Sequence, residues 1–203
     1  MTPALERHLV LHGVAVKRNG AVGDVAAVAG LSLGTAARWL SHLVETGRVV
    51  AANGAYVLTP LARLALDGDY SRFGWELRAD TAFMQAYDRF ERINLRLKDL
   101  ITEWQTLLIG GARVANDHSD KEHDDRMIDR LGDFHDHAEL VLSALETGDP
   151  RFAFYRAGLS EALDKAEDGA VEWVSDARIA SYHTLWFELH EDLLRIVGRE
   201  RVE

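Results

Sequence analysis

The first 72 residues alternate short apolar stretches with capping and turn-forming residues. Ser/Thr residues stand where helices should begin, and Gly30 and Gly47 stand where two of them should end. Asn53-Gly54 suits a two-residue type I′ hairpin turn, because both positions need a positive φ. The pattern predicts a helix after Thr2-Pro3, a short helix over 24–29, a helix over 32–45, a hairpin over 49–58 and a helix over 61–66.

A much longer apolar stripe follows, over about residues 78–108. Its positions alternate in steps of four and three, which is a heptad seam. They are Phe83, Tyr87, Phe90, Asn94, Leu97, Ile101, Trp104 and Leu108. Asn94 is the one polar member, and it could fix helix register, fix a dimer or bond a neighbouring histidine. The stripe predicts one long helix that Gly110-Gly111 ends, and a seam of this length favours a homodimer.

The remaining chain predicts three further helices. A polar loop over 116–120 leads into a helix that reaches about Leu145, and Gly148-Asp149-Pro150 interrupts the chain. Another helix is expected over 151–166, and a last one from a Ser175 cap to Val197. Together these segments predict an all-α antiparallel helical bundle over 73–203, joined to residues 1–72 by a linker at 67–71.

Charge separates the two parts of the chain. Residues 1–72 carry seven Lys/Arg and five Asp/Glu, whereas residues 73–203 carry 16 and 28, for a net charge of −10 overall. An acidic surface repels phosphates, so any nucleic-acid contact should come from residues 1–72. The absence of cysteine excludes disulfides, thiolate zinc sites and a cysteine nucleophile. No apolar run spans a membrane and no signal-peptide pattern is present, so we expect a cytoplasmic protein without a membrane partner.

The stretch 26–49 resembles the winged-helix regulators of the MarR, PadR and ArsR kind, and Tyr56–Pro60 resembles their wing-to-helix passage. Gly30 permits the tight turn between the second and third helices, and Ala36, Leu40 and Leu43 share the inward face of the third. The expected fold is therefore mainly α: an N-terminal winged helix-turn-helix (1–72) with a small β-hairpin wing, followed by the acidic helical bundle (73–203).

The outward face of the third helix is the candidate surface for double-stranded DNA. Its predicted contacts are Ser32, Gly34, Thr35, Ala37, Arg38, Ser41, His42 and Arg48. Arg38 is the one fixed positive charge on that exposed face, and the hairpin tip over 51–55 has no cation. A winged helix that docks a protein is therefore an alternative, and DNA binding would need two copies.

A second resemblance spans nearly the whole chain. The stretches 102–105, 116–120 and 181–193 resemble helical modules found in or beside bacterial phosphoenolpyruvate-utilising proteins related to pyruvate phosphate dikinase, where a similar winged helix precedes the same helices. The phosphohistidine and nucleotide-grasp domains of such enzymes and a P-loop are all missing from the sequence. The resemblance implies a two-part module and a phosphoenolpyruvate-utilising partner, with no phosphate transfer by this chain.

Aromatic and histidine side chains of the bundle are the candidate site for a small-molecule effector. The predicted ligand-binding residues are Trp104, Gln105, Asp117, His118, Tyr182, His183, Trp186 and His190. We expect the histidines and nearby carboxylates to form one polar cluster, because a buried imidazole needs a partner. His123, His135 and His137 stand among acidic residues and are expected on a solvated face.

No cofactor is firmly implied, although the same cluster could hold a transition metal. The metal candidates are His118, His183, His190, Asp117 and Glu191, whose spacing matches no known ligand signature. A buried polar network is the structural alternative. Because no nucleophile–base pair stands out, we expect no enzyme activity. The favoured hypothesis is a DNA-binding regulator whose bundle dimerises and senses an effector, and the alternative is a regulatory module that acts on a partner enzyme.

Overall fold

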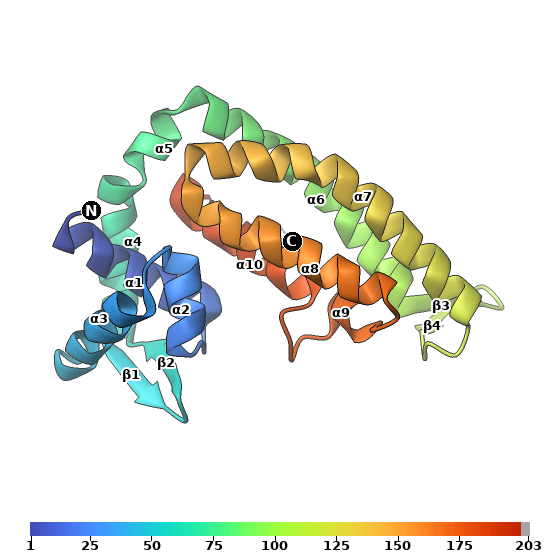
Figure 1. Cartoon of the computed structure of the whole chain (residues 1–203), viewed down its shortest axis with the longest axis horizontal. Helices are drawn as coiled ribbons and strands as arrows, with labels where there is room; N and C mark the ends of the chain where they lie inside the picture. Colours follow the sequence, from blue (N-terminus) through green and yellow to red (C-terminus); the bar gives the residue numbers. More distant parts are fainter. Residues whose placement is uncertain (200–203) are drawn as a thin grey trace.

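The computed structural model describes residues 1–199, so the last four residues of the predicted second part lie outside it (Figure 1). The chain is mainly helical, which confirms the predicted class, and the described residues include two small antiparallel hairpins. The elements from α1 to α4, over residues 3–73, form one group, and the long helices of the bundle extend away from it (Figure 1).

The first group has the predicted order of three helices, a hairpin and a helix. Its elements are α1 (Pro3–Lys17), α2 (Val22–Ala29), α3 (Leu33–Glu45), β1 (Val49–Ala52), β2 (Ala55–Leu58) and α4 (Pro60–Phe73). The predicted caps are present: Thr2, Ser32 and Thr59 each accept a backbone N–H of the first turn. Valine and leucine side chains from these elements form a separate buried core.

The hairpin is held in place by its turn and by a bridge to the first helices. Asn53 and Gly54 both have positive φ, as the predicted turn requires. The β2 residue Tyr56 donates its backbone N–H to the carbonyl of Gly20 at 3.0 Å. Since Gly20 lies between α1 and α2, this bridge fixes the hairpin beside both helices.

The predicted linker at 67–71 is wrong, because α4 continues through it to Phe73. Leu66 and Tyr70 are buried at a spacing of four, so the apolar face of α4 passes over the polar Asp67-Gly68-Asp69 stretch. Tyr70 also places its hydroxyl 2.7 Å from Nδ1 of His12. A short helix, α5 (Trp75–Ala79), then turns the chain toward the bundle.

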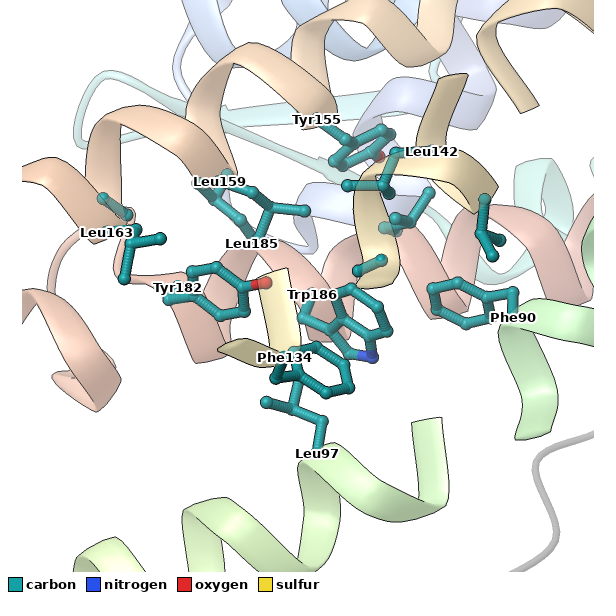
Figure 2. Packing of buried hydrophobic residues seen from close by; sticks show 14 of the residues in the cluster. Phe90, Leu97, Phe134, Leu142, Tyr155, Leu159, Leu163, Tyr182, Leu185 and Trp186 are labelled. Atoms are coloured by element: carbon teal, nitrogen blue, oxygen red, sulfur yellow. The ribbon is translucent and has the colours of Figure 1, made fainter. Parts of the chain in front are cut away.

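The bundle is built from four long helices. Its elements are α6 (Thr81–Gln105), α7 (Lys121–Gly148), α8 (Ala153–Glu167) and α10 (Tyr182–Val197), with a 3₁₀ turn (Pro150–Phe152) before α8 and the short α9 (Glu172–Ser175) after it. The predicted seam from Phe83 to Trp104 is buried within the chain. Trp186 of α10 stacks on Phe90 with ring centroids 4.7 Å apart, and Phe134 of α7 meets the same indole edge-on (Figure 2). The seam is therefore occupied by α7 and α10 of its own chain.

Two bundle predictions are wrong. The long helix begins at Thr81 and ends at Gln105, and a hairpin of β3 (Thr106–Ile109) and β4 (Ala112–Ala115) follows. Leu108, the expected last seam position, lies on that hairpin and is 73% exposed. Gly110 and Gly111 both have positive φ and form the turn of this hairpin. The helix has already ended at Gln105, so the prediction that these glycines end it is wrong, and residues 73–203 are not all-α.

The last helix begins at Tyr182 and not near Ser175, which instead ends α9. Ser181 caps α10 by accepting the backbone N–H of Thr184 at 3.3 Å. Within residues 1–199, no helix combines the length and the apolar character needed to cross a membrane.

Candidate functional site

The outward face of α3 is exposed as predicted. Ala36, Leu40 and Leu43 are fully buried beneath it. Ser32, Gly34, Ala37, Arg38, Ser41 and His42 are exposed, whereas Thr35 and Arg48 are half-buried. A helix with one buried stripe and small or polar residues opposite presents a surface that can approach a groove or a partner closely.

Arg38 does not stand alone on this face. Its side chain is 70% exposed, and a guanidinium nitrogen lies 3.9 Å from the Glu6 carboxylate of α1. The same carboxylate accepts the indole N–H of Trp39 at 2.9 Å. Glu6 therefore partly offsets the positive charge of Arg38, although an exposed pair of this length is weak and an incoming phosphate can displace it.

A groove of about 810 Å³ opens between α6 and α10, and it contains three of the predicted ligand-binding residues. These are His183, Trp186 and His190, which lie at spacings of three and four on α10. The α6 side and the chain after α10 contribute residues that the sequence hypothesis did not include: Tyr87, Glu91, Arg92, Asn94, Leu95, Lys98 and Arg199. The volume is in the range of small-molecule sites, about 300–1,000 Å³.

Two side-chain contacts cross this groove. Trp186 donates its indole N–H to the amide oxygen of Asn94 at 3.0 Å. Of the alternatives given for Asn94, a hydrogen bond to a neighbouring histidine is therefore replaced by a hydrogen bond to a tryptophan. Nε2 of His190 lies 3.0 Å from a carboxylate oxygen of Glu91. Both contacts fix α10 against α6, and they set the positions of the aromatic and imidazole rings that line the groove.

The predicted single cluster is not formed, because His118 belongs to a second polar group at the far end of α6. Nδ1 of His118 lies 3.0 Å from the buried carboxylate of Asp124, and its ring packs on Trp104 at 4.6 Å. Asn116 donates to both the Trp104 carbonyl and Asp124. Trp104 is thirteen residues beyond Glu91, about 20 Å along an α-helix.

The other predicted site residues are dispersed. Gln105 and Asp117 are exposed. Glu191 pairs with Arg195 at 2.7 Å and is not among the residues that line the groove. Tyr182 is buried and contacts Nδ1 of His135 at 3.1 Å. His135 is only 8% exposed, so the prediction of a solvated face is wrong for this histidine, whereas His137 is exposed.

The metal candidates do not assemble into a ligand set. His118 is separated from His183 and His190, and Glu191 faces Arg195. No three His, Asp or Glu side chains among residues 1–199 are placed so that they could hold a metal ion together.

The face of α10 opposite the groove contacts the first group of helices. Lys17 of α1 donates to Glu188 at 2.7 Å. Nε2 of His12 lies 2.9 Å from the fully buried carboxylate of Asp192. One helix thus lines the groove on one side and holds α1 on the other.

Asp192 is the centre of a buried charged network. Arg151 contacts its carboxylate at 3.3 Å and donates to the backbone carbonyl of Val28 in α2 at 2.7 Å, and the Tyr155 hydroxyl donates to Asp192 at 3.0 Å. Burial by itself would raise the pKa of Asp192, but Arg151 and His12 hold that pKa well below its usual range. The carboxylate therefore remains charged and ties α10 to α1 and α2.

Sequence reasoning missed the α6 side of the groove. Glu91, Asn94 and Lys98 follow one another at spacings of three and four, a signal of a shared helix face.

Comparisons of the chain with protein-family models, with curated proteins and with solved structures found no significant match.

Proposed function

We propose that this protein is a DNA-binding transcriptional regulator of the winged helix-turn-helix type, with the groove between α6 and α10 as its effector site. The observation that carries the proposal is α10, which lines the groove and, through Asp192 and Glu188, holds the helix α1 that packs beside α3. A ligand that displaces α10 would therefore bias the position of the recognition face.

The first group of elements supports the DNA-binding half. Its helix, helix, helix, hairpin, helix order matches the resemblance to MarR-, PadR- and ArsR-like regulators, and the Gly20–Tyr56 bridge holds the hairpin beside the helices. In this arrangement the exposed residues of α3 enter the major groove, and the hairpin lies beside the sugar–phosphate backbone. Arg38 is the main fixed charge toward DNA.

The proposal includes two copies on a palindromic site, because a single helix with one arginine supplies little affinity. The seam of α6 cannot join them, since α7 and α10 of the same chain cover it. Exposed leucines elsewhere, including Leu140 on α7 at 77% exposure, are the apolar positions that a dimer could cover. Light scattering with and without DNA measures the copy number.

The direct test is capture of genomic DNA by the purified protein at low salt, where phosphate attraction is strongest. The expected result is enrichment of a few fragments, including the upstream region of the protein's own gene. Binding that is uniform along the genome, or no binding at all, would contradict the regulator proposal.

The charge of the recognition face favours a second candidate function. Glu6 offsets Arg38, and the hairpin tip has no cation. A face of this kind suits a protein partner, which in the second resemblance would be a phosphoenolpyruvate-utilising enzyme. Binding of such an enzyme by the full chain, with loss in an Ala37→Asp variant and no DNA capture, would establish this candidate in place of the first.

A further inference from the structure

The groove between α6 and α10 combines an aromatic floor with a basic rim. Phe187, which is 36% exposed, provides the accessible ring, and Leu95, which is 62% exposed, extends the apolar surface, whereas Trp186 lies buried beneath them. The rim carries Arg92, Lys98 and Arg199. Because residues 73–203 carry 16 cationic and 28 acidic side chains, a groove with three Lys/Arg and one carboxylate reverses the local balance of charge.

The rim cations are available to a ligand. Among the described residues, neither Arg92 nor Lys98 forms an ion pair, whereas other bundle cations such as Arg130 and Arg156 are paired with glutamates. Arg199 lies over the Tyr87 ring at 5.1 Å and 3.8 Å from the exposed Asp88. An exposed cation without a carboxylate neighbour retains its full attraction for an incoming anion.

The one carboxylate in the groove does not neutralise this rim. Glu91 lies 3.0 Å from Nε2 of His190, so it has a partner inside the groove wall. Asn94 accepts the Trp186 indole N–H through its oxygen. Its amide nitrogen, for which the described part of the chain offers no acceptor, remains a donor at the groove surface.

We infer that the groove takes an organic anion with a flat aromatic body, its rings on Phe187 and Leu95 and its acid group at Arg92 and Lys98. The inference rests on the proposed function, because it names the chemical class of the effector. Aromatic side chains favour flat apolar ligands by stacking, and paired cations favour a carboxylate or sulfonate over a neutral group. A volume of about 810 Å³ accommodates a ligand of two or three fused or linked rings.

The same ring surface contacts the first group of elements. The Arg18 guanidinium lies 5.4 Å from the centre of the Phe187 ring. Arg18 ends α1, two residues before Gly20, which pairs with Tyr56 of the hairpin. A ligand that stacks on Phe187 would therefore compete with Arg18 at a segment that holds the hairpin.

The test compares two fluorescent probes with the same ring skeleton. 8-Anilinonaphthalene-1-sulfonate is an aromatic anion, and N-phenyl-1-naphthylamine lacks the sulfonate. The binding of each is titrated with the wild type, with Arg92→Gln/Lys98→Gln, and with Arg89→Gln/Arg126→Gln as a control of equal charge loss at exposed positions outside the groove. Melting temperatures verify that both double variants are folded.

The expected result is one anionic probe per chain, bound more tightly than the neutral probe. Affinity for the anion should fall about tenfold or more in the groove variant, with little change for the neutral probe and little change in the control variant. Equal affinity for the two probes, or equal losses in the two double variants, would overturn the inference. DNA capture is measured separately, so failure of DNA binding with retained anion selectivity rejects the regulator proposal and not the groove chemistry.

Discussion

Nε2 of His12 lies 2.9 Å from the carboxylate of Asp192, and both side chains are almost completely buried. The contact joins the first helix of the chain to the last. Arg151 approaches the same carboxylate from the segment between α7 and α8. A charge in this position is stable only while its partners remain, because a buried unpaired ion is costly.

Asp192→Ala should therefore destabilise the protein strongly. The substitution removes the carboxylate that Arg151, His12 and Tyr155 share, although Arg151 keeps Asp149 at 2.9 Å. We therefore expect a loss of about 3 kcal/mol in the free energy of unfolding. Urea denaturation measures the loss. Asp125→Ala is the matched control, because Asp125 is exposed on α7, and it should change stability by less than about 0.5 kcal/mol. A similar small effect at both positions would contradict the network.

Because His8 is buried, we expect the free energy of unfolding to fall as the pH is lowered. Burial, then the charges of His12 and Arg151, lowers the pKa of His8 to about 3. The unfolded chain binds a proton near pH 6.5 and the folded chain does not, so stability is lost as the pH falls from about 6.5 toward 3. The slope from this group is at most about 1.4 kcal/mol per pH unit.

His8→Phe should reduce that slope, because the new ring can stack on Phe73 as the imidazole does, at 4.5 Å, without a titrating group. Melting temperatures between pH 7 and 5 provide the measurement. The control is His42→Phe, since His42 is exposed. An unchanged slope in His8→Phe would show that His8 is not the group responsible.

Much of this fold follows from local sequence signals. The caps at Ser32 and Thr59 and the Asn53-Gly54 turn depend on neighbouring residues only, and the structure has all three where the sequence predicts them. The linker at 67–71 was wrong because burial of Tyr70 against α1 outweighs the turn propensity of Asp-Gly-Asp. Tertiary contacts of this kind cannot be predicted from the local sequence pattern.

The candidate site was predictable only in part. His183, Trp186 and His190 share a face of one helix, which periodicity reveals, and they do line one groove. Which helix would face them depends on bundle topology, so Glu91 and Lys98 were missed and His118 was wrongly included. The separation of His118 follows from the β3–β4 hairpin, which holds it near Trp104.

The Asn94–Trp186 hydrogen bond predicts a coupling between the two residues. Asn94→Leu would suit the apolar seam, yet it leaves the buried indole N–H without an acceptor. We expect a loss of about 1–3 kcal/mol in the wild type. In a Trp186→Phe background, Asn94→Leu should lower the free energy of unfolding by at least about 1 kcal/mol less, because phenylalanine has no N–H that would lose its acceptor. Additive losses in this double-mutant cycle would mean that the bond does not stabilise the bundle.

The proposed contact between the exposed face of α3 and DNA depends most on Arg38, the one fixed positive charge on that face. Fluorescence anisotropy with a captured genomic fragment compares the wild type, Arg38→Ala and Arg126→Ala, an equal loss of charge on α7. Arg38→Ala should weaken binding at least about tenfold and lower the slope of log K against log[salt] by about one unit per chain, while Arg126→Ala should change neither. Equal affinities and equal slopes for all three proteins would show that this face of α3 does not contact DNA.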